Sequence, residues 1–178
     1  MSRIAAVVLA AGAATRFGGP KQVELLPEVL LRVAASPVDE IVVVEGAYGL
    51  RVDATQARIR LVRCAEWERG PGASLRCGLA TLGGDVAAAV VVLADGPRLV
   101  PESVSRVIES WRDEGGDVVA ASYGGTRGHP LLLARALWDD VPDEGFRVVA
   151  PRLVPCDDLG APGDVDTRDD LAALDRDG

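Results

Sequence analysis

The chain has few of the residues that would place it in several common protein classes. Its 178 residues include three cysteines, Cys64, Cys77 and Cys156, which are widely spaced and form no CxxC pair. An odd number in this arrangement predicts neither a zinc site nor a disulfide framework, and it indicates a reducing compartment. No apolar run approaches the roughly 20 residues of a membrane-spanning helix, and the first residues lack a signal-peptide pattern. We therefore expect a cytoplasmic protein without a membrane partner.

Positively charged residues are fewer than acidic ones. Lysine and arginine number 19 against 27 acidic residues, which gives a formal net charge of -8, and 48% of the residues are hydrophobic. This balance argues against a nucleic-acid partner, because an acidic protein must concentrate its cations locally to hold an anion. The length and composition predict one globular domain over residues 1–178.

One segment, IAAVVLAAGAATRFGGPKQ at residues 4–22, stands out against the acidic background. Residues 4–9 are apolar without polar alternation, which is typical of a central parallel strand. Glycines in the following loop allow backbone N–H groups to approach an anion closely, and two cations add positive charge. The residues concerned are Gly12, Gly18, Gly19, Arg16 and Lys21. This arrangement predicts a triphosphate-binding loop.

The two standard glycine-rich phosphate motifs do not fit this loop. A Walker A loop requires Ser or Thr after Gly-Lys, whereas Pro20 precedes Lys21 and Gln22 follows it. The dinucleotide fingerprint GxGxxG is missing as well. On loop composition alone, an ordinary strand-to-helix turn with two solvated cations fits equally well.

Further strands and helices alternate along the chain. Short runs of branched apolar residues predict strands at 41–44, 59–62, 87–93 and 118–121. Apolar spacing predicts a helix that begins near Pro101 and includes Trp111, and a shorter helix through Leu75, Leu79 and Leu82. Such alternation predicts a mainly parallel sheet whose ligands bind at the carboxyl ends of the strands, where Gly12 and Asp95 fall.

Two aspartates are candidate ligands of Mg²⁺, which prefers carboxylates together with phosphate oxygens. Asp95 is the first charged residue after the apolar run AAAVVVLA, although an aspartate in a turn before Pro97 would need no metal. Asp166 lies in GDVDTRDDL. There Thr167 and Asp170 also resemble a capping box that opens the last helix.

The loop LAAGAATRFGGPKQ resembles the signature loop of the molybdenum cofactor nucleotidyltransferases, the MobA/MocA-like family of NTP transferases. Four further segments match in order: WERGPGASLRCGL at 67–79, LADGP at 93–97, GGTRGHPLLL at 124–133 and DVDTRDDL at 164–171. The resemblance implies a Rossmann-like three-layer α/β/α domain of the glycosyltransferase-A type with a mainly parallel mixed sheet.

The resemblance also implies an activity. Family members transfer a nucleoside monophosphate from an NTP to a phosphorylated acceptor with Mg²⁺ and release pyrophosphate. The LAAG of this chain resembles the cytidylyl-transferring members, so CTP and a molybdopterin-type acceptor are the expected substrates, with a molybdoenzyme or its chaperone as recipient of the product. The alternatives are a GTP-dependent guanylyltransferase, a sugar phosphate or similar acceptor, and a catalytically silent nucleotide-binding or cofactor-carrier module.

Site roles follow from the same resemblance. Lys21 would hold the α and β phosphates and Arg16 the β and γ phosphates, while Asp95 and Asp166 would bind Mg²⁺. An acceptor that is already an anion needs no strong general base, which suits a chain whose only histidine is His129. His129 would contact the pterin or its phosphate, or serve as a structural hydrogen-bond partner. The loop residues expected at the nucleotide are Leu9, Ala10, Ala11, Gly12, Ala13, Ala14 and Gly18. The residues expected toward the acceptor are Trp67, Gly70, Gly72, Ser74 and Leu75. The alternative is a loop with Ser74 as an N-cap and Leu75 in the core, which is favoured for Leu75.

Two segments depart from the family pattern. After Lys21 the family usually has a longer connection, whereas here VELLPEVLLRV leads directly into a helical pattern that Pro27 interrupts. In LADGP, Gly96 stands where the family usually has Gln or Met, which affects substrate identity more than catalysis.

Overall fold

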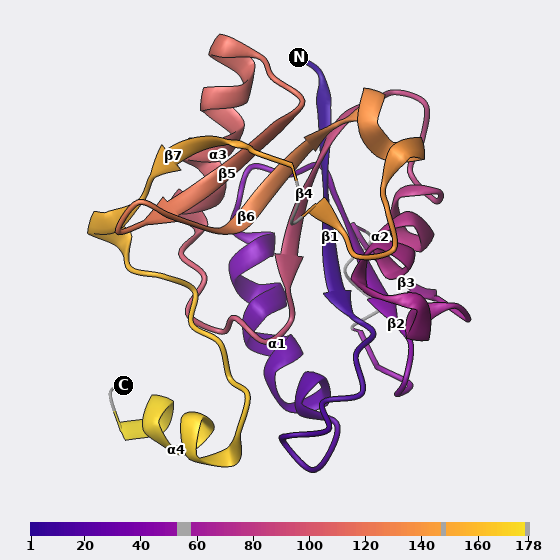
Figure 1. The fold of residues 1–178 in the computed structure, drawn as a ribbon, viewed down its shortest axis with the longest axis vertical. Coiled ribbons are helices and arrows are strands. Elements are labelled where there is room, and N and C mark those ends of the chain that lie inside the picture. Colours follow the sequence, from indigo (N-terminus) through magenta and orange to yellow (C-terminus); the bar gives the residue numbers. More distant parts are fainter. Residues whose placement is uncertain (53–57, 147–148, 177–178) are drawn as a thin grey trace.

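The computed structural model describes residues 1–52, 58–146 and 149–176, and its centre is a seven-stranded mixed sheet (Figure 1). The strand order is β3-β2-β1-β4-β6-β5-β7. Strands β1 to β4 are parallel to one another, while β6 runs antiparallel to its neighbours β4 and β5. The strands are β1 (Arg3–Ala10), β2 (Glu40–Glu45), β3 (Ile59–Arg63), β4 (Val86–Leu93), β5 (Val118–Tyr123), β6 (Thr126–Ala134) and β7 (Arg152–Pro155).

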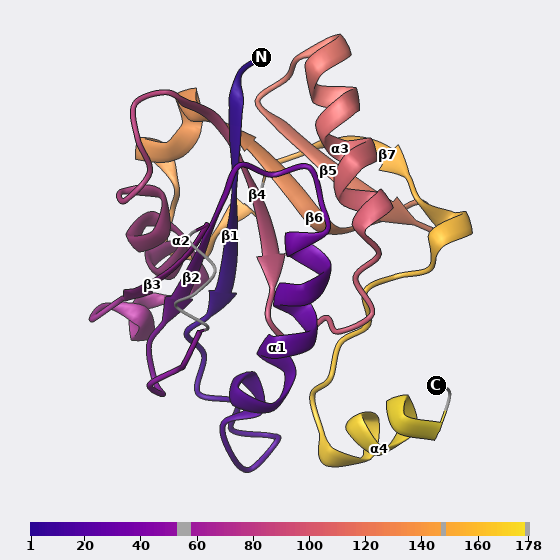
Figure 2. The ribbon, with the colours of Figure 1, turned by 180° about the vertical axis from the view of Figure 1, so that it is seen from behind.

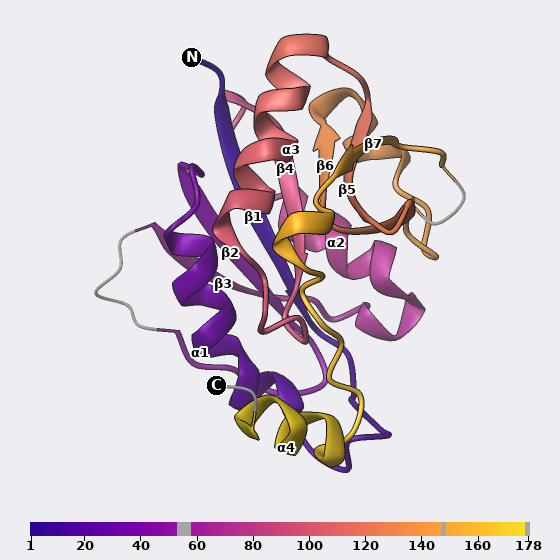
Figure 3. The same ribbon diagram turned by 90° about the vertical axis from the view of Figure 1, so that its left-hand side faces the viewer.

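Helices cover both faces of this sheet and complete three layers. Helices α1 (Lys21–Ala34) and α3 (Pro101–Glu114) lie on one face, which Figure 2 shows from the front. Helix α2 (Pro71–Leu79) and the 3-10 helix η2 (Arg135–Asp140) pack on the other face, as the edge view shows (Figure 3). The remaining elements are η1 (Trp67–Arg69), η4 (Asp157–Leu159) and α4 (Arg168–Arg176). None of the helices in the described residues is long and apolar enough to cross a membrane.

The sequence pattern explains the central strands. Residues Ile4, Val7 and Val8 of β1 are fully buried, because helices cover the sheet on both sides. The predicted strands are all present, each extended by one or more residues. Strands β6 and β7 were not predicted. Gly128 and Pro130 interrupt the pattern of β6, and β7 is only four residues long.

Helix α1 shows that the expected interruption at Pro27 is wrong. The helix continues through Pro27, which lies on its exposed side. Pro27 lacks the N–H group that would bond the carbonyl of Val23 one turn earlier. Val23 is 48% exposed, so water can satisfy that carbonyl and the helix is not broken.

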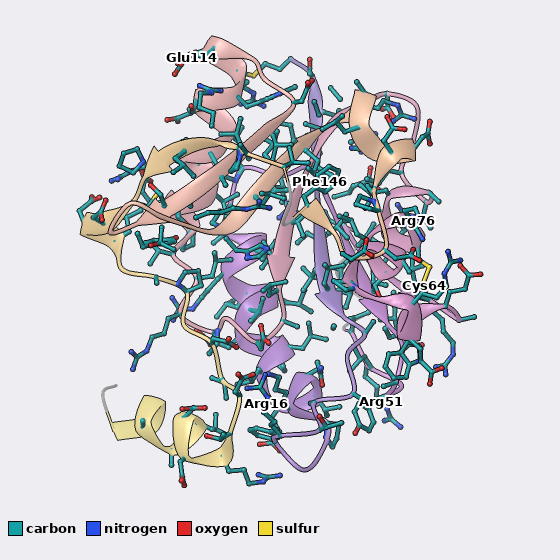
Figure 4. All side chains as sticks on the ribbon, in the orientation of Figure 1. Arg16, Arg51, Cys64, Arg76, Glu114 and Phe146 are labelled. Atoms are coloured by element: carbon teal, nitrogen blue, oxygen red, sulfur yellow. A yellow bond between two sulfur atoms is a disulfide. The ribbon has the colours of Figure 1, made fainter. Side chains whose placement is uncertain are left out.

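The expectation of no disulfide is also wrong. Cys64 directly follows β3, and Cys77 lies on α2, which packs against β2 and β3. This packing brings their Cα atoms to 5.7 Å, and the two residues form a disulfide (Figure 4). The sequence pattern could not reveal the pair, because the packing of α2 on the sheet creates it. The inference of a reducing compartment loses the support that it drew from unpaired cysteines.

Candidate functional site

The loop between β1 and α1 has a special backbone conformation. Gly18 has a φ of 74°, and Ala14 has a φ of 49°, in the left-handed region that favours glycine. The Tyr48 hydroxyl donates a hydrogen bond to the Ala13 carbonyl at 2.9 Å, and the Ala47 N–H donates to the Ala11 carbonyl at 2.9 Å. The loop is therefore fastened to the segment that follows the neighbouring strand β2.

Gly46 supports the site by close packing, and it was not predicted from the sequence. A Cβ atom on Gly46 would lie 2.6 Å from Cγ of Trp67 and 2.7 Å from the Ala11 carbonyl oxygen. Only glycine allows these three segments to meet so closely. The available signal was a glycine directly after a buried strand, at the edge of the sheet where ligands bind.

Lys21 is the first residue of α1, and its ammonium group lies among acceptors from two distant segments. Its Nζ atom is 3.0 Å from Asp95 Oδ2, 3.3 Å from Asp166 Oδ1 and 2.6 Å from the Val165 carbonyl oxygen. Burial alone lowers the pKa of Lys21, but the two carboxylates outweigh burial and raise it above its ordinary value. Lys21 is thus held as a cation although it is only 6% exposed.

Arg16 reaches the same acidic group from the loop. Its Nη1 atom is 3.1 Å from Asp166 Oδ2, while 77% of its side chain remains exposed. Figure 4 shows Arg16 at the end of the molecule where the loop lies. The structure therefore brings both predicted phosphate cations to one predicted metal ligand.

A segment near the C-terminus, residues 161–167, crosses the sheet edge beside β4, and we call it the acidic strap. The Val165 N–H donates to the Asp95 carbonyl at 3.1 Å, and the Arg98 N–H donates to the Pro162 carbonyl at 2.8 Å. A Cβ atom on Gly96 would lie 3.1 Å from Cβ of Pro162, which is closer than an ordinary van der Waals contact. The strap therefore passes close to Gly96, and a side chain at position 96 would displace it by a few tenths of an ångström.

Helix α4 extends the acidic strap and packs onto the loop between β1 and α1 (Figure 3). We call this loop, residues 11–21, the phosphate loop after its predicted ligand. Leu171 of α4 packs against a small buried cluster that includes Phe17 and Val165. The Arg168 guanidinium carbon lies 4.7 Å from the centre of the Phe17 ring. At the start of the helix, the Thr167 N–H donates to Asp170 Oδ2 at 2.7 Å and the Asp170 N–H donates to Thr167 Oγ1 at 3.2 Å, which confirms the capping box.

Three carboxylates gather where the strap meets β4. One oxygen each from Asp95, Asp164 and Asp166 lies within 4.8 Å of the others. Partial burial, together with the charges of Asp95 and Asp166, raises the pKa of Asp164. The sequence analysis selected two of these carboxylates as metal ligands and not Asp164. The signal was the DVD spacing, because alternate residues of an extended segment lie on the same side.

Two hollows adjoin this charged centre, and Asp95 lines both. The first has a volume of about 340 Å³, and its walls are formed by the end of β1, the phosphate loop and the segment around α2. Its lining includes Leu9, Ala11, Gly12, Gln22, Trp67, Gly70 and Ser74. The second has a volume of about 480 Å³ and lies between β4, the β5–β6 hairpin and the strap. Its lining includes Leu99, Tyr123, Thr126, His129, Pro162 and Asp164.

The structure separates residues that were expected to act together toward the acceptor. Trp67, Gly70 and Ser74 lie with Gly12 in the first hollow, whereas His129 lies in the second. Ser74 is the fourth residue of α2 and not its N-cap, and Leu75 is a core residue at 3% exposure. Gly72 is required for packing, because its Cβ would lie 1.7 Å from the Pro142 carbonyl oxygen.

The second hollow combines an apolar wall with one histidine. His129 precedes the cis peptide bond at Pro130, and its carbonyl accepts a hydrogen bond from the Tyr123 hydroxyl at 3.0 Å. Burial raises the pKa of Tyr123, which therefore stays a neutral donor. The backbone of His129 thus has a structural hydrogen-bond partner, and its side chain borders the hollow.

The loop with Arg16 and Lys21, the strand before it and the helix after it match a known family model. The model of the MobA-like NTP transferase domain matches residues 6–144. The chain belongs to this nucleotidyltransferase family. The match includes the phosphate loop, Asp95 and His129, and it ends before the strap. No curated protein matches the chain.

Solved structures match the chain over nearly its whole length. A homologue of Mycobacterium tuberculosis Rv0371c from Mycobacterium sp. strain JC1 has 25% identity and a TM-score of 0.79, with 97% of this chain and 95% of that chain covered. Rv0371c of M. tuberculosis in complex with manganese has 24% identity and a TM-score of 0.73, with 97% of each chain covered. Molybdopterin-guanine dinucleotide biosynthesis protein A of Archaeoglobus fulgidus has 17% identity and a TM-score of 0.69, again with 97% of each chain covered. These likenesses confirm the nucleotidyltransferase fold, including its mixed sheet.

Proposed function

We propose that this protein transfers CMP from CTP to a phosphorylated acceptor, a molybdopterin-type cofactor, in a Mg²⁺-dependent reaction that releases pyrophosphate. One observation carries the proposal. The Lys21 ammonium meets Asp95 and Asp166 at the point where two hollows adjoin. A charged centre between two separate binding spaces suits the transfer of a charged group from one ligand to another.

The nucleotide belongs in the first hollow, because the phosphate loop lines only that one of the two. Lys21 stands at the N-terminus of α1, where the helix dipole also favours an anion. Arg16 is exposed enough to turn from Asp166 toward the terminal phosphates. The nucleoside then lies between the end of β1 and the segment with Trp67 and Ser74.

Asp95, Asp164 and Asp166 would hold the metal ion. Their donor set consists only of carboxylate oxygens close to one another, which fits Mg²⁺ or Mn²⁺ and not a softer metal. The manganese complex of Rv0371c supports a divalent ion in this fold. When bound, the ion neutralises charge on the phosphates.

The acceptor belongs in the second hollow. A volume of about 480 Å³ with an apolar wall and Tyr123 suits a ring system such as a pterin better than a small sugar phosphate. An acceptor phosphate oxygen attacks the α-phosphorus, the bond from that phosphorus to the bridging oxygen breaks, and pyrophosphate leaves. Lys21 and Arg16 neutralise the charge on the departing pyrophosphate. The attacking oxygen is already an anion, so no side chain needs to remove a proton, and the product would pass to a molybdoenzyme or its chaperone.

The proposal is tested by pyrophosphate release with molybdopterin as acceptor and CTP, GTP, ATP or UTP as donor. We expect release with CTP that requires both Mg²⁺ and the acceptor. Release with GTP alone would favour a guanylyltransferase, the activity suggested by the name of the A. fulgidus protein. Nucleotide binding without release would favour the silent binding module.

A further inference from the structure

Four consecutive carbonyl groups of the phosphate loop accept hydrogen bonds from the protein. The carbonyls of Ala11, Gly12, Ala13 and Ala14 accept, in turn, from the Ala47 N–H at 2.9 Å, Gln22 Nε2 at 2.8 Å, the Tyr48 hydroxyl at 2.9 Å and the Phe17 N–H at 3.1 Å. Within residues 1–52, 58–146 and 149–176, the N–H groups of residues 12–15 have no acceptor. The acceptors of the loop are thus occupied, and its donors are left for an anionic ligand.

The peptide group between Ala13 and Ala14 controls how this row of donors is arranged. A peptide bond is planar and trans, so its carbonyl and its N–H point in opposite directions. The hydrogen bond from Tyr48 to the Ala13 carbonyl therefore also sets the direction of the Ala14 N–H. Ala14 has a φ of 49°, which a residue with a side chain keeps only where the surrounding contacts hold it. Tyr48 supplies such a contact at this peptide.

Tyr48 is itself held in place by the segment that follows β2. The carboxylate of Glu45, which is 8% exposed, accepts a hydrogen bond from the Leu50 N–H at 2.6 Å and closes the turn that carries Tyr48. Gly46 packs against Trp67 at the start of the same turn. Among the described residues that line the two hollows, Tyr48 is absent. Its hydroxyl therefore acts on the phosphate loop from behind and not on a ligand.

We propose that Tyr48 is a positioning residue, whose hydroxyl holds the peptide between Ala13 and Ala14 so that the loop N–H groups face the phosphates of the nucleotide. This inference rests on the proposed function, since it needs a triphosphate at the loop. Tyr48 takes no part in the chemical step. Its contribution to affinity should grow with the number of phosphates on the ligand, because it acts only through the loop.

Titration calorimetry with Mg²⁺ and no acceptor tests the inference, because binding is then measured without turnover. Tyr48→Phe removes the hydroxyl and keeps the ring, so the dissociation constant of CTP should rise about 3- to 10-fold, while that of CMP should change less than about 2-fold. Ser36→Ala is the matched control. It removes a hydroxyl that donates to the Arg32 carbonyl at 3.0 Å, beyond the far end of α1, and should leave both dissociation constants unchanged.

The ratio of the CTP and CMP affinities separates positioning of the phosphate loop from a general structural role. If Tyr48→Phe weakened CTP and CMP by the same factor, the hydroxyl would support the whole hollow, and the inference would be overturned. Unchanged binding of CTP to Tyr48→Phe would overturn it as well. Absence of binding of CTP, GTP, ATP and UTP to the wild-type protein would instead overturn the proposed function, and this inference with it.

Pyrophosphate gives a second measurement, because it has phosphates and no nucleoside. Its dissociation constant in the presence of Mg²⁺ should also rise about 3- to 10-fold in Tyr48→Phe and stay unchanged in Ser36→Ala. If Tyr48→Phe weakened CTP and left pyrophosphate unaffected, the hydroxyl would act on the nucleoside side of the hollow, and the inference would be overturned.

Discussion

The phosphate loop and the acidic strap meet at Asp95, yet they are built in opposite ways. The loop supplies Arg16 and Lys21, and it connects the buried strand β1 to the start of α1. The strap supplies Asp164 and Asp166 and has no strand or helix of its own over residues 161–167. It is held by backbone hydrogen bonds to Asp95 and Arg98 and by the packing of α4. Lys21 is thus fixed by the core, whereas Arg16 stays exposed and two of the three carboxylates are held only by tertiary contacts.

The largest effect on activity is expected at Asp95, which both the phosphate loop and the acidic strap contact. Asp95→Asn removes the carboxylate that comes from β4, so pyrophosphate release should fall on the order of 10³-fold. Asp113→Asn, an exposed position on α3, is the matched control and should keep the wild-type rate. Retention of more than a tenth of the rate in Asp95→Asn would mean that the carboxylates act only through the strap.

Lys21→Met separates the cation of the loop from the carboxylates. Turnover should fall about 10²-fold, because the triphosphate loses its buried counter-charge. Mn²⁺ binding without nucleotide should instead tighten by about 10-fold, because the ammonium no longer lies between Asp95 and Asp166. Titration of Mn²⁺ followed by electron paramagnetic resonance measures this directly.

Lys21→Arg is the control for that experiment, since it keeps the charge and should leave the Mn²⁺ affinity close to the wild-type value. Unchanged Mn²⁺ affinity in Lys21→Met would contradict competition between the ammonium and the metal.

The sequence predicts the phosphate loop better than it predicts the acidic strap. The loop could be predicted because its strand, glycines and cations lie together in 22 residues. Asp95 could be predicted because it ends an apolar run. The meeting of the strap with the loop could not, since Lys21 and Asp166 are 145 residues apart in the sequence. The missed disulfide has the same cause, because it depends on the packing of α2 on the sheet, whereas β6 was missed because Gly128 and Pro130 interrupt its local pattern.

Leu171→Ala tests whether α4 supports the loop. The variant removes a half-buried side chain from the cluster with Phe17 and Val165, which should lower stability by about 1 kcal/mol. The KM for nucleotide should rise several-fold while kcat changes less, because the loop loses its packing and keeps its charges. If kcat fell several-fold while the KM for nucleotide stayed unchanged, α4 would support the metal ligands alone.

Gly96→Ala should have the smallest effect. The new Cβ would lie 3.1 Å from Cβ of Pro162 and 3.4 Å from the Gly163 carbonyl oxygen, so the strap must shift by a few tenths of an ångström. We expect a loss of stability below about 1 kcal/mol and a rise in the KM for the acceptor, measured by thermal unfolding and kinetics. Gly84→Ala, where a Cβ meets nothing within 4 Å, is the control. If both variants behaved alike, close contact of the strap with Gly96 would be irrelevant to the acceptor.

Thermal unfolding with nucleotide tests the central claim most directly. CTP with Mg²⁺ at ~100 times its dissociation constant should stabilise the protein by about 2.7 kcal/mol. For a domain of this size, that corresponds to a rise in Tm of roughly 5 to 10 °C. EDTA should remove most of the rise, because the charge of the triphosphate is then met by Arg16 and Lys21 alone. An unchanged Tm with CTP, GTP, ATP and UTP in the presence of Mg²⁺ would contradict a nucleotide site between the phosphate loop and the acidic strap.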